Sequence, residues 1–422
     1  MGLGPFTGQT HYRVGPSWPS HRSAVCSWRR KYFPYRASLL MAGLYLHVPY
    51  CRQACHYCDF HFSTQLGTQE AMVESMGREV ETRIPEPRMM QTWYWGGGTP
   101  SLLTSAQVKT LVDGFIRHTP LVPKGEFTLE ANPEDVSDVQ LRSWREIGVN
   151  RLSMGIQTFV DRRLAWMNRA HSGEQARDAV RRAQDAGLEN ITVDLMYGLP
   201  ETSLSEWQEN VGQALELGVP HLSTYALTVE DKTALHHQIK KGTTSAPKDE
   251  RAREDFLWLR SALRTAGWEP YELSNASKPG MRAQHNSAYW SGEAYVGIGP
   301  GAHSYDGAAI RQWNVSHNLR YIRGWKPGAS PEGLVEVEVL SLLDQKNERI
   351  MTSLRRMEGL LRSDMGPYAE TLDRRWKSFL ENGWMTATDS GWVLTDEGLL
   401  WMDMVAAEGF ATAEDLGTFV SS

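Results

Sequence analysis

The chain has 422 residues, of which 41% are hydrophobic and 22% charged, with a net charge of -6 and four cysteines. This length allows a large core in about two domains, and the negative charge gives no overall attraction to nucleic acid or an anionic membrane. No apolar run reaches the roughly 18–20 residues of a membrane span, and the few cysteines exclude a disulfide scaffold. We therefore expect a soluble globular protein.

Residues 1–40 differ from the rest because they contain six Lys and Arg residues and neither Asp nor Glu. This bias suits an organelle transit peptide. Two other interpretations stay open: translation starts at Met41, or the segment is a basic extension without a targeting role. Cys26 lies in this segment, far from the other cysteines, so we do not expect it to bind a metal with them.

From residue 41 to about 275 the sequence repeats a short β-rich run, a loop and an amphipathic helix. We expect strands at 44–48, 92–95, 127–131, 151–156, 191–198 and 222–229. We expect helices at 69–82, 105–118, 136–147, 173–186, 204–217 and 249–266, several of which end at a glycine. The alternation predicts an α/β fold with a parallel sheet, a partial (βα)6 barrel like a TIM barrel, whose ligands bind at the carboxyl ends of the strands.

The loop after the first expected strand holds three cysteines within eight residues: Cys51, Cys55 and Cys58. Their C-x3-C-x2-C spacing allows a zinc site, although structural zinc sites usually take two pairs of ligands from separate places. The candidates for a fourth zinc ligand are His47, His56 and His61. Three thiolates in one loop better suit a [4Fe–4S] cluster, which keeps one iron open for another ligand.

Most of the other expected strands carry glycines or polar residues at their carboxyl ends. These residues would lie at the same end of the barrel as the cysteines. The glycines of "GGGTP" (96–100) expose backbone groups to a ligand with a carboxylate and an ammonium. Asp194 lies in an apolar run, where a carboxylate is costly unless a ribose or a cation satisfies it. In the simpler interpretation Glu130, Gln157 and Asp194 are ordinary polar residues at strand ends, and Arg169 in "MNRAHS" is a solvated cation beside a helix. The strand-end residues are Glu130, Gln157, Asp194 and Ala226.

Residues 276–329 are expected to connect the barrel to a second domain, and they contain "HNSAYW" (285–290). A histidine beside aromatic residues can ligate heme iron, with the rings flanking the porphyrin. His285 is the first candidate ligand and His303, in "GPGAHS", the second. The alternative is a loop histidine held by ordinary hydrogen bonds.

Residues 330–422 predict a mostly helical, winged-helix-like domain: two helical stretches, a hairpin with "DSG" at its turn, and a final helix. The segment contains 17 acidic and 8 basic residues. Phosphate binding requires the opposite charge, so we expect no nucleic-acid partner. The domain is expected to cover the barrel mouth or to bind another partner.

The combined motifs resemble the radical S-adenosylmethionine (SAM) superfamily. Over about residues 42–400, the order "LYLHVPYC…CDF", "GGGTP", "LEANP", "GIQTF", "NRAH" and "VDLMYGLP" resembles its coproporphyrinogen-dehydrogenase-like branch. The resemblance implies that the three cysteines hold a [4Fe–4S] cluster and that its open iron chelates SAM, whose reductive cleavage yields methionine and a 5′-deoxyadenosyl radical. It also implies SAM contacts by Tyr45, Tyr57, Gly97, Gly98, Thr99, Glu130, Gln157, Arg169, Asp194 and Ala226.

Within this branch the chain resembles the HemW heme chaperones. The oxygen-independent coproporphyrinogen III oxidases carry another cysteine where this chain has Phe60, and their long N-terminal arm is missing if Met41 is the start. Two downstream motifs, "HNSAYW" and "YVGIGPGAHS" (295–304), are similar to HemW. The resemblance thus implies heme as a third cofactor, bound by His285 or His303.

The function implied is delivery of heme to an apo-hemoprotein, such as a respiratory enzyme. The alternatives are oxidation of coproporphyrinogen III and a non-catalytic zinc or Fe–S module. The resemblance also implies an electron donor such as flavodoxin or ferredoxin, and a homodimer. The expected location is the cytoplasm, or the mitochondrion if residues 1–40 are a transit peptide.

Overall fold

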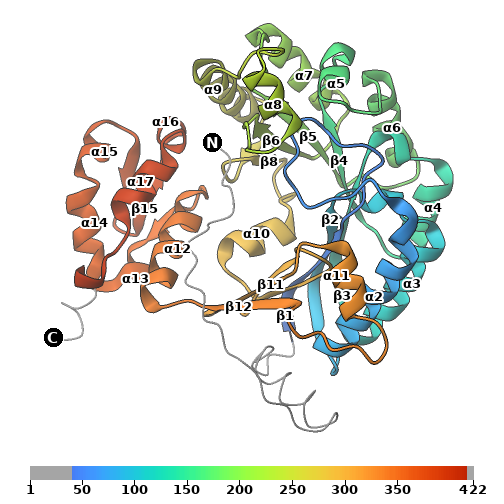
Figure 1. Ribbon diagram of the computed structural model, residues 1–422. Coiled ribbons are helices and arrows are strands. Elements are labelled where there is room, and N and C mark those ends of the chain that lie inside the picture. The colour runs from blue at the N-terminus through green and yellow to red at the C-terminus, as the bar shows by residue number, and fades with distance from the viewer. Residues whose placement is uncertain (1–39, 416–422) are drawn as a thin grey trace.

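The computed structural model describes residues 40–415, and its main element is one twelve-stranded, curved sheet (Figure 1). An internal cavity lies inside the curve. Six strands lie side by side in chain order and pair in parallel. They are β1 (Leu40–Val48), β2 (Met89–Gly97), β3 (Leu121–Ala131), β4 (Arg151–Gln157), β5 (Ile191–Tyr197) and β6 (His221–Ala226). Within residues 40–415 the sheet does not close, because β12 and β7 form its two edges. The predicted α/β fold with a partial parallel barrel is confirmed.

All six predicted helices are present, and no end differs from its expected position by more than two residues. They are α2 (Gln69–Arg83), α3 (Ser105–His118), α4 (Asp138–Glu146), α6 (Gly173–Asp185), α7 (Leu204–Glu216) and α9 (Asp249–Thr265). Capping boxes at Thr104 and Ser172 fix two of the starts, since each side chain accepts a hydrogen bond from the third helical backbone N–H. Shorter helices that were not expected are α5 (Asp161–Trp166), α8 (Ala234–Lys240) and α11 (Asn318–Gly324).

The alternation of side chains along each strand separates the core from the site. On β2, Trp93 and Trp95 are buried on the outer face, where both rings pack against Phe115 of α3 and Phe127 of β3 at centroid distances of 5.1–6.3 Å. Tyr94, between them, points to the inner face, because successive strand residues face opposite sides. The aromatic core therefore lies between the sheet and its helices, and the polar inner face remains free to line a site.

Residues 276–329, expected as a connector, extend the sheet instead. Strand β9 (Tyr295–Ile298) pairs in parallel with β1, and three antiparallel strands follow it. These are β10 (His303–Tyr305), β11 (Ile310–Asn314) and β12 (Val335–Val339). Because β12 belongs to the large sheet, the C-terminal module begins after it rather than at residue 330. The other sheet edge carries β8 (Asn275–Ser277) and β7 (Glu269–Pro270).

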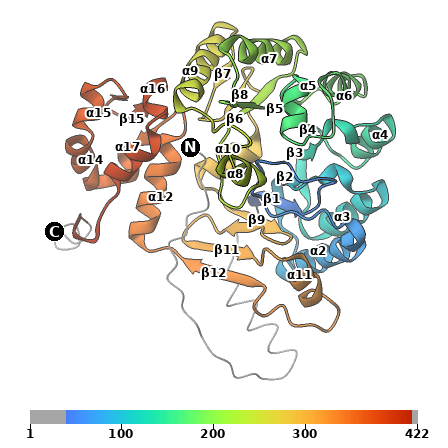
Figure 2. The ribbon, with the colours of Figure 1, turned by 45° about the horizontal axis from the view of Figure 1, so that its top comes forward.

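The "HNSAYW" motif forms helix α10 (Gln284–Ser291), which lies inside the curve of the sheet (Figures 1 and 2). It contacts the inner faces of β1 and β2 and also touches α12 (Leu342–Leu354) of the C-terminal module. The loop alternative for this motif is thus replaced by a helix that crosses the inside of the barrel.

A buried ion pair joins the barrel to the strands that extend it. Arg83 and Glu79, one turn apart on α2, lie 2.8 Å from each other with side chains at most 1% exposed. Glu79 also accepts hydrogen bonds from Asn314 of β11 and from Tyr321 of α11, while Arg83 donates to the backbone oxygen of Gly297. The pairing and these hydrogen bonds compensate the two buried charges, as burial requires.

The C-terminal module lies beside the barrel and has the predicted winged-helix-like order (Figure 1). Its helices are α12 (Leu342–Leu354), α13 (Arg362–Met365), α14 (Ala369–Arg375), α15 (Lys377–Glu381), α16 (Asp396–Leu399) and α17 (Met402–Gly409). Its sheet contains β13 (Leu360–Leu361), β15 (Gly391–Leu394) and β14 (Met385–Ala387), with the "DSG" turn in the β14–β15 hairpin. Ion pairs from Arg260 and Arg264 of α9 to Asp396 attach the module to the barrel.

In residues 40–415, single turns of 3-10 helix occupy four connections: Leu66–Thr68, Pro100–Leu102, Pro133–Asp135 and Gly366–Tyr368. Within the described range, no helix is both long and apolar enough to cross a bilayer. Cys26 and all but the last residue of the basic segment 1–40 lie outside the described residues.

Candidate functional site

A cavity of about 2930 Å³ occupies the inside of the curved sheet. Ligand pockets commonly measure about 300–1,000 Å³, so this cavity has room for more than one cofactor. Its walls come from the barrel strands, α10, the β10–β12 extension, α12, and residues 399–403 of the C-terminal module. Every residue assigned from the sequence to a cluster, SAM or heme lines it: Tyr45, Cys51, Cys55, Tyr57, Cys58, Gly97, Gly98, Thr99, Glu130, Gln157, Arg169, Asp194, Ala226, His285 and His303.

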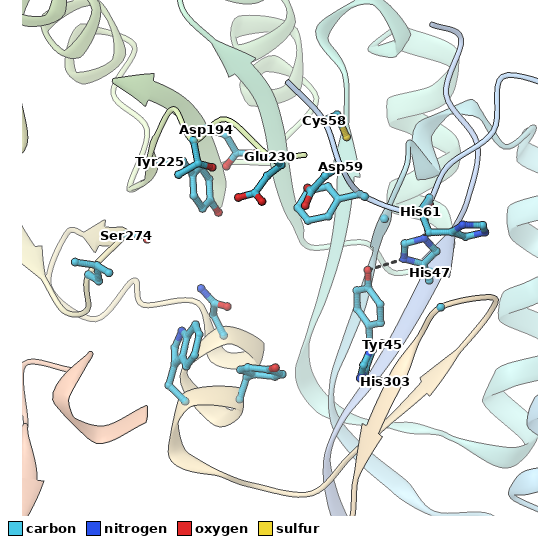
Figure 3. A pocket seen from close by; sticks show the side chains of 18 of the residues that line it. Tyr45, His47, Cys58, Asp59, His61, Asp194, Tyr225, Glu230, Ser274 and His303 are labelled. Carbon is cyan, nitrogen blue, oxygen red and sulfur yellow. Dashed lines mark hydrogen bonds between the residues drawn. The ribbon is translucent and has the colours of Figure 1, made fainter. Parts of the chain in front are cut away.

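The cysteine loop follows β1 and reaches over the mouth of the barrel (Figure 3). All three of its cysteines are free thiols and half-buried. Two hydrogen bonds fix the loop to the segment after α5: Gln53 donates to the backbone oxygen of Asn168, and the Asn168 side chain donates to the oxygen of Ala54, both at 2.7 Å. Burial raises the pKa of the Cys58 thiol to about 12, so its thiolate requires a nearby positive charge or metal.

Two side chains direct hydrogens at the cysteine sulfurs. Thr99 Oγ1 lies 3.5 Å from Cys51 Sγ, and Arg169 Nη1 lies 3.4 Å from Cys55 Sγ. Arg169 is therefore not the solvated cation that its local sequence suggests. Its Nε atom is buried and has no hydrogen-bond partner in the part of the chain described, which leaves one donor for a bound ligand.

The histidines considered as zinc ligands are engaged elsewhere. His47 Nε2 lies 2.9 Å from the backbone oxygen of His61, which only accepts, so this nitrogen carries the proton; Nδ1 then accepts from Tyr45 Oη at 3.1 Å. His56 Nδ1 contacts the Trp166 oxygen, and His61 Nε2 contacts Asn318 Oδ1. Across residues 40–415, no three Cys, His, Asp or Glu side chains are grouped to hold one metal ion. The donors present suit a multi-iron cluster better, since each thiolate can bind a separate iron.

Two buried carboxyl groups face the cavity from β3 and β5. Glu130 accepts hydrogen bonds from Tyr94 Oη at 2.6 Å and from the Gly97 backbone N–H at 3.2 Å, and Asp194 accepts from Ser153 Oγ at 3.2 Å. The pKa of each carboxyl is raised to about 7, mainly by burial, and the charge of Glu130 contributes to the rise at Asp194. A cationic or hydroxyl-bearing ligand would stabilise their ionised forms.

The glycines of "GGGTP" are required by close contacts. A Cβ at Gly98 would lie 2.6 Å from the Tyr50 oxygen, and one at Gly97 would lie 2.6 Å from the His47 ring. Gly97 also has φ of +109°, which other residues rarely adopt. Gln157 ends β4 at φ of +68° with its side chain almost fully buried. Positive φ at a non-glycine residue is uncommon and often marks a binding site.

His285 of α10 is held with one ring nitrogen available. Thr92 Oγ1 donates its one proton to the backbone oxygen of Ala42 at 3.0 Å. In its 2.7 Å contact with His285 Nδ1 it must therefore accept, so Nδ1 carries the proton. The lone pair is then on Nε2. The imidazole stacks on Tyr94 at 5.1 Å, and burial lowers its pKa to about 4, so it is neutral at physiological pH. A neutral imidazole with an anchored Nδ1–H is the usual state of a metal-ligating histidine.

Aromatic rings surround the same part of the cavity. His303 stacks on Trp313 of β11 at 5.8 Å, and burial lowers its pKa. Tyr289 of α10 packs against Tyr295, and the guanidinium of Arg355, the residue after α12, lies 4.1 Å from the Trp290 ring centroid. Figure 3 shows Tyr45 hydrogen-bonded to His47, with Asp194 and Tyr225 across the cavity.

Several residues that shape the site were missed from the sequence. Three of them lie within predicted strands, at positions that face the inside of the barrel: Thr92, Tyr94 and Ser153. The alternation of side chains along a strand could have identified them. Asn132 lies in "LEANP", two residues after Glu130, and contacts both sulfur donors. No local signal marks the 399–403 segment as part of the cavity wall.

Comparison with known proteins agrees with this geometry. The family model of the radical SAM superfamily matches residues 45–214. The chain is 34% identical over 369 residues to the heme chaperone HemW of Bacillus subtilis, which covers 85% of this chain and 97% of the relative. It is 37% identical over 268 residues to the mouse mitochondrial radical S-adenosyl methionine domain-containing protein 1, covering 62% of this chain and 60% of that protein.

A solved structure is also similar over most of the chain. Escherichia coli coproporphyrinogen III oxidase (HemN), a radical SAM enzyme, aligns with a TM-score of 0.77 over 89% of this chain and 92% of its own. The sequences are 20% identical, so this likeness concerns the fold.

Proposed function

Because the chain belongs to the HemW family of the radical SAM superfamily, we propose that it is a heme chaperone that binds a [4Fe–4S] cluster, SAM and heme. In this proposal it passes heme to an apo-hemoprotein. One observation carries the proposal: a single cavity contains the cysteine loop, the buried carboxyls Glu130 and Asp194, and the available Nε2 of His285.

The cluster and SAM are assigned to the carboxyl ends of the strands. Cys51, Cys55 and Cys58 hold the cluster, while Glu130 and Asp194 bind the polar groups of SAM. The donor set supports the assignment, since two thiols receive hydrogen bonds and both carboxyls are buried with raised pKa values. When bound, the cluster supplies the electron for reductive cleavage of SAM. The remaining contacts are assigned to Tyr45, Tyr57, Gly97, Gly98, Thr99, Gln157, Arg169 and Ala226.

Heme is assigned to the side of the cavity formed by α10 and the β10–β12 extension. His285 Nε2 is the proposed iron ligand, and His303 is the second candidate. Tyr289 and Trp290 line the cavity and supply flat aromatic surface for a porphyrin face. The size of the cavity supports simultaneous binding of SAM and heme.

The competing function is oxidation of coproporphyrinogen III. This reaction requires a radical generator and a porphyrinogen held in a precise position. Misplacement of the substrate by about 1 Å can lower the rate about a hundredfold. At the position of the additional oxidase cysteine this chain has Phe60, which is 70% exposed and lines the cavity. The higher identity to a heme chaperone than to the oxidase structure also favours delivery.

The remaining partners follow from the same proposal. Reduction of the cluster calls for an electron donor such as flavodoxin or ferredoxin, and the recipient is a hemoprotein such as a respiratory enzyme. We assign no nucleic-acid partner, and we propose a homodimer. The proposed location is the cytoplasm, or the mitochondrion if residues 1–40 direct import.

Anaerobic reconstitution with iron, sulfide, SAM and heme tests the function. The protein is incubated with apomyoglobin as a spectroscopic heme acceptor, and separately with coproporphyrinogen III and a reductant. We expect heme transfer to the apoprotein and no decarboxylated product by chromatography. Protoporphyrinogen formed over multiple turnovers would overturn the chaperone assignment in favour of the oxidase.

A further inference from the structure

Asn132 connects the two side chains that donate to the cysteine sulfurs. It follows β3 directly, and its Oδ1 accepts from Arg169 Nη2 at 2.7 Å while its Nδ2 donates to Thr99 Oγ1 at 3.3 Å. The same Arg169 contacts Cys55 Sγ through Nη1, and the same Thr99 contacts Cys51 Sγ through Oγ1. One amide thus contacts both donors, which come from different loops.

The polarity of this amide determines the direction of the hydrogen bonds. A threonine hydroxyl has one proton to donate and lone pairs that accept. Because Asn132 Nδ2 can only donate, Thr99 Oγ1 must accept from it, and its own proton remains for Cys51 Sγ. At the other end, Oδ1 can only accept, and it holds the Arg169 guanidinium beside Cys55. A second acceptor, the Gly155 backbone oxygen, lies 2.5 Å from Nη2 and fixes the guanidinium further.

We propose that Asn132 is a positioning residue that raises the reduction potential of the cluster by orienting Thr99 and Arg169 toward its thiolates. The inference rests on the proposed function, since it takes Cys51 and Cys55 as cluster ligands. Reduction adds negative charge to the cluster, and hydrogen bonds to its sulfurs stabilise that charge. Among the described residues the hydrogen bonds to the two sulfurs come from Thr99 and Arg169, so the proposed effect of Asn132 passes through these two donors.

The test is a redox titration of the reconstituted protein, without SAM, monitored by the electron paramagnetic resonance signal of the reduced cluster. Asn132→Asp keeps the acceptor for Arg169 but replaces the N–H donor by an oxygen, so Thr99 turns its proton toward residue 132. We expect a lower midpoint potential than wild type. Asn132→Leu, which is neutral and similar in size, should also lower the potential but by a smaller amount.

Two controls separate orientation from charge and from general damage. In a Thr99→Val background the hydroxyl is already absent, so Asn132→Asp should lower the potential by less than it does in wild type. Asn190→Asp is the matched substitution: Asn190 Oδ1 accepts from Arg151 Nη1 at 3.0 Å, and it does not line the cavity. We expect Asn190→Asp to leave the potential unchanged.

The outcomes distinguish this inference from the function on which it rests. A wild-type protein that takes up no iron–sulfur cluster would overturn both. A cluster present in every variant, with the same potential in wild type, Asn132→Asp and Asn132→Leu, would overturn the role of Asn132 alone. If Asn132→Asp shifted the midpoint potential equally with and without the Thr99 hydroxyl, the shift would be an effect of charge alone. That result would also overturn the role of Asn132.

Discussion

His285 and Thr92 are 193 residues apart in the chain, yet His285 Nδ1 lies 2.7 Å from Thr92 Oγ1. This contact joins α10 to the inner face of β2. A Cβ at Gly43 of β1 would lie 2.7 Å from the same Nδ1, so the close approach of the helix requires glycine there. The imidazole is therefore held in one orientation, with Nε2 as the nitrogen available to a ligand.

The first prediction concerns heme. His285→Ala removes the proposed iron ligand, so we expect a changed Soret band and weaker heme binding in an absorption titration. Thr92→Val keeps the imidazole but removes its anchor, and the loss of such an outer partner typically weakens metal binding by about 10–100-fold. His303→Ala should have the smaller effect. A His285→Ala protein with wild-type spectrum and affinity would exclude His285 as the ligand.

A second prediction concerns stability and pH. The pKa of Asp194 is about 7 in the folded protein, against an ordinary value of 3.8. Between these values the folded protein binds the proton more tightly than the unfolded chain, so this carboxyl lowers the stability of the ligand-free protein as the pH rises toward about 7. Asp194→Asn should therefore melt at a higher temperature than wild type at pH 8, with the difference lost near pH 4.

Circular dichroism melts at several pH values measure this difference. The matched control is Asp113→Asn, which removes a largely exposed carboxylate paired with Lys109. It should give no gain at pH 8. A pH-independent difference between Asp194→Asn and wild type would contradict the raised pKa.

SAM binding gives a third prediction. If Asp194 contacts SAM in its ionised form, the affinity of wild type should increase as the pH rises through about 7. Asp194→Ala should bind SAM more weakly and with a smaller pH dependence, since Glu130, whose pKa is also about 7, remains in the site, while its iron and sulfide content stays at the wild-type level. Calorimetry on the reconstituted proteins at several pH values measures the SAM affinity and its pH dependence. Equal affinities in the two proteins would remove Asp194 from the site.

The fourth prediction concerns the cluster. Cys58→Ala removes one of three thiolate ligands, so the reconstituted variant should lose the iron-dependent absorbance and most of its iron and sulfide. Cys26→Ala is the matched control, and it should retain both. Stoichiometric zinc without iron-dependent absorbance in wild type would favour the zinc alternative.

The last prediction concerns the buried ion pair on α2. Arg83→Met leaves Glu79 buried without its charged partner, and breaking such a pair typically costs about 3–5 kcal/mol. The double variant Arg83→Met with Glu79→Gln removes both charges and should be more stable than Arg83→Met alone. Urea unfolding measures the free energies. Equal stability of wild type and Arg83→Met would show that the pair contributes nothing.

Much of the fold was predictable because its signals are local. Strand and helix periods, capping residues such as Thr104 and Ser172, and the glycines after several helices all act within a few residues. They determined the order of the six βα units and the helix ends to within two residues. The rule that parallel strands place their ligands at the carboxyl ends then brought Glu130 and Asp194 to one mouth with the cysteines.

The parts that were not predictable depend on contacts between distant segments. The sequence of α10 has almost no amphipathic pattern, and its position inside the barrel comes from β1 and β2, more than 180 residues earlier. Likewise, β9 joins the sheet beside β1, so a segment expected as a connector becomes part of the cavity wall.

By itself the sequence determined which residue types lie at the strand ends and how the three cysteines are spaced, since both follow from local order along the chain. Only the tertiary structure decided which histidine keeps a free nitrogen and that Asn132 spans both sulfur donors. The reason is that a hydrogen bond has direction. Whether Thr92, Thr99 or His47 donates or accepts depends on partners from several strands, which no local pattern specifies.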